Sequence, residues 1–292
     1  MTRRIDVPSP TVPTVAPRVC DGRLTLTTAL AVTTADVTGA GTLYFTPFRG
    51  NLIGLYGGGL WKLYVLPELS LSLTLTSGKN YDVFVYNNAG VLTLELSAAW
   101  TNDTTRADAI ALQDGVYVKS GTTSRRLVGT IRASGTNTTE DSAAKRYVFN
   151  AQNRMPRDLL TIDTTDTWSY TTATWRQANA NTANKVEVLI GLQEEKVEVD
   201  VFAMAQVNLN NAALAYVGVG VDSTTVPSGL RQNAYNNAAL AAMALNAHYG
   251  GFPGLGYHAL NWLEKGADIA CLFYGDNGAI GTQCGITGTV WA

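Results

Sequence analysis

The chain has 292 residues, of which 46% are hydrophobic and 15% charged, with a formal net charge of −2. This hydrophobic content excludes a disordered chain, and the small net charge gives no argument for nucleic acid or an acidic membrane surface as a partner. The length suits one large or two ordinary domains, and the Thr, Asn, Ser and Gly that replace charged residues favour an all-β fold.

The N-terminus carries no export signal, because Arg3 and Arg4 are followed by Pro-rich sequence and not by an apolar segment. No stretch reaches the roughly 18 apolar residues of a membrane span. We therefore expect a protein made in the cytosol of its host, without a membrane partner. Cys20, Cys271 and Cys284 are a poor disulfide framework and a poor zinc site. A Cys271–Cys284 bond is the minor alternative to Cys271 as a small core residue.

Residues 1–20 are predicted to form an extended Pro-rich arm, since closely spaced prolines favour polyproline II and block helix. A mobile terminus is the plain alternative. We expect instead that the arm lies against its own domain or, preferably, against a partner subunit. The candidate attachment residues of the arm are Arg3, Arg4, Pro8, Pro10, Pro13 and Pro17.

Residues 21–156 are predicted to form an antiparallel β domain. Its clearest part is a run of hairpins from Tyr81 to Ala133, with turns at Ala89-Gly90 and Asp114-Gly115. A further hairpin is predicted around Gly57-Gly58-Gly59, which lacks the Lys-Ser/Thr and the helix of a phosphate-binding loop.

Two short helices are predicted within this domain. Asp103–Leu112 opens with helix-capping residues, and Thr138–Arg146 carries its acids first and its bases last, which suits a helix dipole. The polar segment Asn150–Arg157 is the predicted domain boundary.

Residues 157–292 are predicted to form a second all-β domain. Lys196–Ala205 alternates charged and apolar residues, as a strand with one buried face does. The Ala-rich Ala238–His248 suits a helix by propensity, but its surroundings favour a strand with a face of small residues. About eight strands with regular turn spacing predict a jelly-roll-like β-sandwich.

Several segments resemble a family of tailed-bacteriophage virion proteins, over roughly Asp21 to Pro156. They are Tyr81–Tyr86, Trp100–Arg106, Gln113–Gly121 and Glu140–Arg146. The C-terminal half resembles the jelly-roll knobs of phage fibre and capsid-decoration proteins, at Gly256–His258, Trp262–Glu264, Tyr274–Asp276 and Gly285–Trp291. The resemblance implies a place on the particle surface as fibre, spike or cement, and it brings no catalytic residues.

Catalytic or metal chemistry has little support. The two histidines, His248 and His258, would need nearby acids, and only Glu264 and Asp268 are close in sequence. A packing or interface role for the histidines is the stronger reading. We therefore predict no enzyme activity, no metal site and no cofactor.

Aromatic residues beside Gly-rich loops are the candidate contact residues. Such residues anchor subunit interfaces or stack on sugars, and here an interface is preferred to sugar binding. The alternative is that they cap the sandwich cores. They are Tyr56, Trp61 and Tyr64 in the first half, and Tyr249, Phe252 and Tyr257 in the second.

The sequence thus predicts a structural protein of a phage virion surface that forms a homotrimer and binds major capsid protein or tail or portal subunits. Capsid decoration (cement) is preferred, since no long fibrous segment separates the arm from the knob. The alternative is a tail or head fibre that recognises a host surface glycan, and a depolymerase is the weakest reading.

Overall fold

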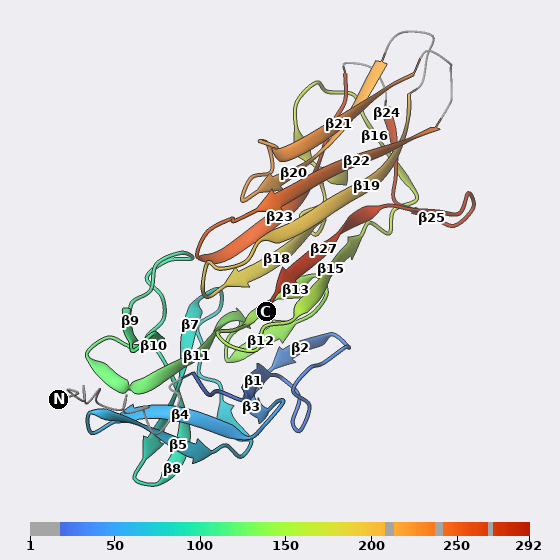
Figure 1. Ribbon diagram of the computed structural model, residues 1–292. Coiled ribbons are helices and arrows are strands. Elements are labelled where there is room, and N and C mark those ends of the chain that lie inside the picture. Colours follow the sequence, from blue (N-terminus) through green and yellow to red (C-terminus); the bar gives the residue numbers. More distant parts are fainter. Residues whose placement is uncertain (1–17, 208–212, 237–241, 268–270) are drawn as a thin grey trace, which may run out of the picture.

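The computed structural model describes residues 18–207, 213–236, 242–267 and 271–292. These residues form β-strands and one 3-10 turn, η1 (Ala178–Ala180), with no α-helix among them, which confirms the predicted all-β class. Figure 1 shows an elongated molecule with the N-terminal half at one end and the C-terminal half at the other. None of the described residues belongs to a helix that could cross a membrane.

The N-terminal half is built on one mixed-length antiparallel sheet in the order β8–β7–β11–β14, extended by β10 and β9, and on a smaller sheet β1–β3–β6. Buried apolar residues such as Phe45, Val83 and Ile131 fill the space that these sheets enclose. The strands of this half are β1 (Gly22–Thr25), β2 (Val37–Ala40), β3 (Thr42–Pro47), β4 (Leu52–Gly57), β5 (Leu60–Val65), β6 (Leu69–Ser72), β7 (Asn80–Asn88), β8 (Val91–Leu96), β9 (Ile110–Gln113), β10 (Val116–Lys119), β11 (Thr122–Gly135), β12 (Thr138–Asp141), β13 (Lys145–Arg146) and β14 (Val148–Asn150).

The predicted hairpins are confirmed, with two-residue loops at the expected turns. Two-residue hairpin loops of type I′ need positive φ at both loop residues, which Gly, Asn and Asp tolerate best. The β7–β8 loop has φ of 50° at Ala89 and 102° at Gly90. The β4–β5 loop has 64° at Gly58 and 82° at Gly59, so the triple glycine is a turn.

The two predicted helices are wrong. Ile110–Gln113 is strand β9, paired with β10 across the Asp114-Gly115 turn. Thr138–Asp141 and Lys145–Arg146 are strands β12 and β13, joined by a turn in which Ser142 and Lys145 exchange backbone hydrogen bonds of 2.9 and 3.1 Å. Strand pairing therefore overrode the local capping signals, with the neighbouring β10 in the first case and with the distant β2 and β18 in the second.

The C-terminal half contains two antiparallel sheets that face each other. One has the order β18–β23–β20–β21, and the other has the order β16–β24–β19–β22. The strands are β15 (Pro156–Ile162), β16 (Thr167–Tyr170), β17 (Arg176–Gln177), β18 (Lys185–Ile190), β19 (Val197–Val207), β20 (Ala213–Val221), β21 (Ser228–Asn236), β22 (Ala242–Gly251), β23 (Gly256–Lys265), β24 (Cys271–Tyr274), β25 (Asp276–Asn277), β26 (Thr282–Gln283) and β27 (Gly285–Trp291).

The strand order of this half is that of a jelly roll. The eight strands of the two sheets alternate between the sheets in chain order, as they do in a jelly roll. The exception is the hairpin β20–β21, whose two strands lie in the same sheet. Strands β15 and β27 extend the second sheet, because β27 pairs with both β15 and β19. The predicted jelly-roll-like sandwich is therefore confirmed.

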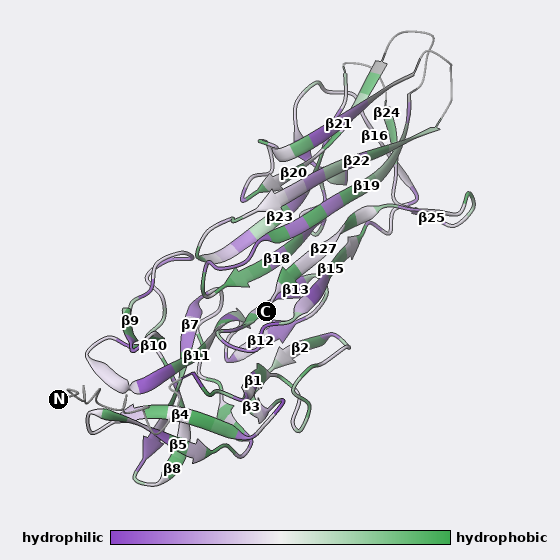
Figure 2. Cartoon of the chain, viewed as in Figure 1, coloured by the Kyte–Doolittle hydropathy of each residue, from purple (hydrophilic) through white to green (hydrophobic). Residues whose placement is uncertain are grey.

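The sandwich core follows the alternation of the sequence. Along β19, Val197, Val199 and Val201 are fully buried, whereas Glu198 and Asp200 face solvent. Figure 2 shows the same alternation of hydrophobic and hydrophilic residues along β19 and β22. The described part of the Ala-rich segment is strand β22, as preferred over helix. The three cysteines are buried free thiols, so the alternative of a Cys271–Cys284 bond is wrong.

The two halves share strands at their junction, which we call the seam. Strand β12 pairs with β2 and β13, and β13 then pairs in parallel with β18 of the jelly roll, with Arg146 opposite Val188. Buried apolar residues nevertheless form one large cluster on each side of the seam. The predicted boundary near residue 156 stays a prediction. Most of the predicted arm, residues 1–17, lies outside the described residues, as does Asp268.

Candidate functional site

The root of the predicted arm lies against β4 and pairs with it through an antiparallel bridge between Cys20 and Ile53. The Gly54 N–H donates to the Val19 carbonyl and the Asp21 N–H donates to the Leu52 carbonyl, each at 2.8 Å. The Asp21 carboxylate also accepts from the Leu52 N–H at 2.9 Å. The direction in which the chain enters the N-terminal half is therefore fixed by backbone pairing.

A buried arginine of β11 clamps this root. Arg126 is 1% exposed, and its Nη1 donates to the carbonyls of Val19 and Gly54, both at 2.8 Å. Burial lowers the pKa of Arg126, but a guanidinium stays charged in proteins. Hydrogen bonds from a charged donor are stronger than neutral ones, and more so away from water. Arg126 therefore holds together two backbone segments that the strand ladder alone joins by few bonds.

Of the three predicted aromatics of the first half, Trp61 is buried, and Tyr56 and Tyr64 are partly buried. Tyr56 and Trp61 meet edge to face with ring centroids 5.6 Å apart. Trp61 is 8% exposed, and its Nε1 donates to Asp114 Oδ2 at 2.9 Å. Tyr64 packs against the main apolar cluster of the N-terminal half. These side chains join the β4–β5 hairpin to the rest of the half.

The three predicted aromatics of the second half lie on or beside the β22–β23 connection. Tyr249 packs against the jelly-roll core, whereas Phe252 is half exposed. Tyr257 is half-buried at the start of β23 and lines a cleft in the seam. Among the described residues, no ring contact joins these three side chains.

The cleft beside Tyr257, which we call the Tyr257 cleft, has a volume of about 460 Å³ and receives residues from both halves. It is lined by Asp103, Thr104, Gln177, Thr182, Lys185, Asp222, Thr224, Tyr257, Ala259 and Asn261. The Tyr257 N–H donates to the Asp103 carbonyl at 3.0 Å. This bond connects the start of β23, which forms part of the cleft wall, to the N-terminal half.

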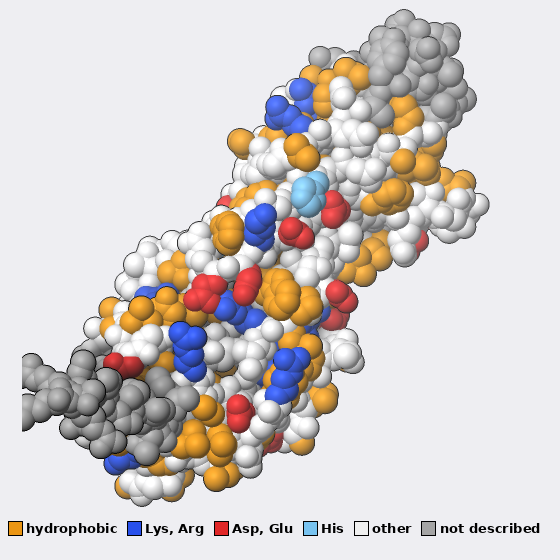
Figure 3. All heavy atoms as spheres, viewed as in Figure 1, with side chains coloured by type: hydrophobic (Ala, Val, Ile, Leu, Met, Phe, Trp, Pro, Cys, Tyr) orange, Lys and Arg blue, Asp and Glu red, His pale blue; other side chains and the backbone are white. Residues whose placement is uncertain are grey.

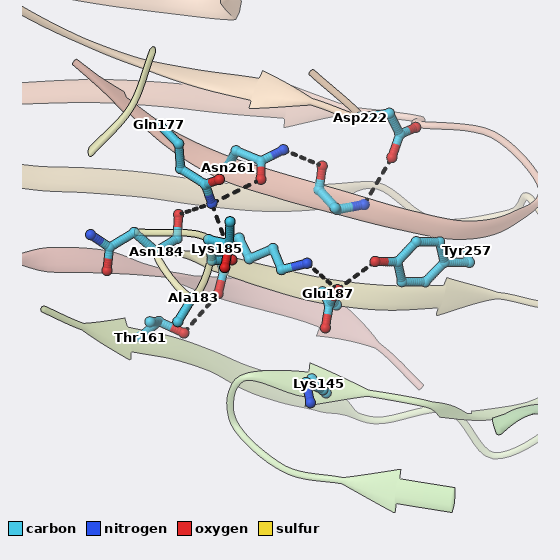
Figure 4. A network of polar contacts seen from close by, with 12 residues as sticks. Lys145, Thr161, Gln177, Ala183, Asn184, Lys185, Glu187, Asp222, Tyr257 and Asn261 are labelled. Atoms are coloured by element: carbon cyan, nitrogen blue, oxygen red, sulfur yellow. Dashed lines mark hydrogen bonds and ion pairs between the residues drawn. The ribbon is translucent and has the colours of Figure 1, made fainter. Parts of the chain in front are cut away.

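Glu187 is the centre of the polar contacts at this cleft (Figure 4). It accepts from Lys185 Nζ at 2.6 Å, from the Tyr147 hydroxyl at 2.9 Å and from the Tyr257 hydroxyl. Burial alone would raise the pKa of Glu187, but these donors outweigh it and hold the pKa below the usual value. Burial and Glu187 raise the pKa of both tyrosines, which therefore remain donors.

The ring of Tyr257 is also engaged. The Arg132 guanidinium lies 3.7 Å from its centroid and pairs with Asp103 at 2.7 Å. Deeper in the cleft, Gln177 Nε2 donates to Asn261 Oδ1 at 3.2 Å, and Asn261 Nδ2 donates to the Gly220 carbonyl at 3.1 Å. Gln177, Asn261, Glu187 and Tyr257 are thus already paired with other protein groups, and their contacts lock the seam.

The histidines have acidic partners other than the predicted ones. His248 Nδ1 lies 2.9 Å from Asp200 Oδ1, and His258 Nδ1 lies 2.7 Å from Asp222 Oδ2. Glu264 instead accepts from Trp168 Nε1 at 2.7 Å and pairs with Arg176 inside the jelly roll. Its pKa is raised because burial outweighs these donors. Within the described ranges, no group of three or more His, Cys, Asp or Glu side chains could hold a metal ion.

Sequence reasoning missed Arg126, Arg132 and Trp291, whose places depend on residues far away in the chain. One signal was present for Arg126, because a strand that continues as Leu127-Val128 buries its neighbours. An arginine at the start of such a run needs a polar partner when it is buried.

We expect Arg126→Gln to lower the free energy of unfolding by about 2–4 kcal/mol, because it removes the charged donor from the Gly54 carbonyl and one of the two donors to the Val19 carbonyl. Hydrogen exchange at the Gly54 amide should accelerate, since the bond of this amide to Val19 lies beside the clamp. The control is Arg125→Gln, which removes a partly exposed pair with Glu95 and should cost less than about 1 kcal/mol. Equal losses in the two variants would contradict the clamp.

We expect Glu187→Gln to reduce the acid sensitivity of the fold. Since the folded-state pKa of Glu187 lies below its usual value of 4.5, its ionised form stabilises the protein above that pH. This stability is lost as the pH falls through the folded-state pKa. Urea unfolding of both proteins between about pH 6 and about pH 3 measures the difference in slope. Parallel curves for the two proteins would show that Glu187 has no such role.

Comparisons with known proteins give likenesses to solved structures only. No protein-family model matches the chain, and no curated protein does. The chain is similar to a structure of infectious bursal disease virus Gt strain, with 14% identity and a TM-score of 0.28, over 88% of this chain and 69% of that one.

Two further likenesses are of the same kind. The insecticidal delta-endotoxin Cry8Ea1 from Bacillus thuringiensis matches with 7% identity and a TM-score of 0.25, over 93% of this chain and 51% of that one. A carbohydrate-binding module of the β-sandwich superfamily matches with 10% identity and a TM-score of 0.21, over 83% and 92%. At these identities and TM-scores, the likenesses carry no argument about function.

Proposed function

We propose that this chain is a structural protein of a bacteriophage particle surface, held by its N-terminal arm, with the jelly roll directed outward. The observation that carries the proposal is the clamped arm root. It lies beside β4, at the end of the molecule opposite β21 and β24 (Figure 1). A chain segment that leaves from one end of an elongated molecule is well placed to attach it.

The proposed mechanism is burial of the arm on neighbouring subunits. Four prolines restrict the free arm, so less conformational freedom is lost when it binds than for an ordinary segment. Arg3 and Arg4 supply positive charge for acidic groups of a partner. The partners we propose are major capsid protein or tail or portal subunits, and the role we prefer is capsid decoration on the virion.

The second candidate function is that of a tail or head fibre that recognises a host surface glycan. The two functions differ in a simple measurement. A decoration protein raises the resistance of particles to heat or osmotic shock, whereas a receptor-binding protein binds host cells or their polysaccharide. Neither role requires an enzyme or a cofactor.

We expect a protein that begins at Arg18 to lose binding to particles that lack the full-length protein. Its thermal unfolding temperature should stay unchanged, because the described contacts of the root begin at Arg18. Co-sedimentation with such particles measures the binding. Full-length protein with Arg3→Glu and Arg4→Glu should bind more weakly and with less dependence on salt. Undiminished binding of the truncated protein would rule out the arm as the attachment.

We also propose that the protein is a homotrimer whose copies meet at β5. Among the described residues β5 pairs with β4 alone, and its Leu60, Leu63 and Val65 are exposed. Exposed apolar side chains of this kind mark contact surfaces, and three copies can gather them around a three-fold axis.

Light scattering should give a mass near three times that of the monomer, and Val65→Lys should lower it. Val91→Lys, at an equally exposed valine of β8, is the control and should leave the mass unchanged. A monomer mass for the unmodified protein would refute the trimer.

A further inference from the structure

A second cleft opens on the seam. It differs from the Tyr257 cleft because several of its polar side chains make no hydrogen bond to another described residue. We call it the Trp291 cleft. It has a volume of about 390 Å³ and lies between the β9–β10 hairpin, the segment after β14, the loop after β18 and the end of β27. The aromatic, amide and charged side chains that line it include Tyr117, Gln152, Arg154, Glu194, Glu195 and Trp291.

Trp291 presents a large flat ring to this cleft. Val290 beside it faces the jelly-roll core, so the alternation of β27 turns Trp291 outward, where it is 43% exposed. All six tryptophans lie within the described residues, and Trp291 is the one with an exposed side chain. Tyr117 adds a second, partly exposed ring from the N-terminal half. Aromatic faces of this kind pair an apolar surface with a polar tip.

Several polar groups of the cleft lack a partner. Within the described part of the chain, the Tyr117 hydroxyl, the Gln152 amide and the Trp291 indole N–H make no hydrogen bond. In the Tyr257 cleft, by contrast, the corresponding hydroxyl and amides are bonded to other protein groups. Free donors and acceptors beside an exposed ring are groups that a ligand can satisfy.

The remaining wall is charged and held in place. Arg154 pairs with Glu194 and also lies 3.6 Å from Glu195, and its guanidinium stacks over the Phe149 ring at 5.5 Å. One guanidinium and two carboxylates leave a net negative charge at the cleft. This charge disfavours ligands that carry carboxylate or sulfate groups.

We propose that the Trp291 cleft binds a neutral saccharide of one or two pyranose rings. The apolar face of a pyranose ring stacks on Trp291, and its hydroxyls bond the Gln152 amide, the Tyr117 hydroxyl and the Glu194 carboxylate. The volume of the cleft lies at the lower end of the range of about 300–1,000 Å³ that is typical of small-ligand sites. Because the Trp291 ring stays open to solvent, the dissociation constant should be on the order of 1 mM. The inference does not depend on how the arm attaches.

The test uses the full chain and a panel of neutral disaccharides of glucose, galactose, mannose and N-acetylglucosamine. Saturation-transfer NMR detects binding. The dissociation constant is obtained by titrating the protein with the disaccharide and monitoring the NMR signals of the protein. At least one neutral disaccharide should bind, and Trp291→Ala should weaken that binding about tenfold or more. Binding of acidic oligogalacturonate but of no neutral disaccharide would overturn the proposal.

Two further variants keep the test decisive if Trp291→Ala is poorly folded. Gln152→Ala removes a half-exposed amide and should weaken binding several-fold without loss of stability. Phe202→Ala removes an exposed ring from β19 outside the cleft and should leave binding unchanged. No binding of any neutral disaccharide at about ten times the expected dissociation constant, or equal binding by all the variants, would overturn the proposal.

Discussion

Buried guanidinium groups donate to main-chain carbonyls at the places where segments far apart in this chain meet. Arg126 does so at the arm root, and Arg146 donates twice to the Asp158 carbonyl at the start of β15. Arg23 serves the carbonyls of Ala31 and Ala292. Since an unpaired buried carbonyl costs about 1–3 kcal/mol, these bonds from charged donors stabilise the buried junctions between segments.

The same need for polar partners explains why clefts with many charged and polar side chains lie at the seam. Most of these side chains bind other protein groups and stabilise the fold. Two sandwich halves that meet end to end leave irregular connections between them, and each needs polar partners from the other half. Charged and hydroxyl groups gather at the seam for that reason, and Figure 3 shows acidic and basic side chains interspersed over the middle of the molecule. A cleft lined by such groups is a candidate for binding only where some of them remain unpaired.

The sequence predicted what alternation and turn chemistry decide. The buried face of β19 and the hairpin loop at Ala89-Gly90 follow from a few neighbouring residues. The capping residues before Ile110 favour a helix locally, whereas the pairing of Ile110 with Lys119 depends on a turn that competes with this helix. The clefts were out of reach for another reason. Trp291 and Tyr117 lie far apart in the chain, and only the joined halves bring them together.

The bond from Arg23 to the Ala292 carbonyl spans 269 positions and has a consequence for how the chain folds. Contacts between distant residues slow folding, because a long loop must close before they form. During synthesis β1 is made early, but Arg23 can bond the Ala292 carbonyl only after β27 has been made and has paired within the jelly roll. We therefore expect the arm-bearing half to pass through a looser intermediate and to reach its final rigidity last, when the distant partner arrives.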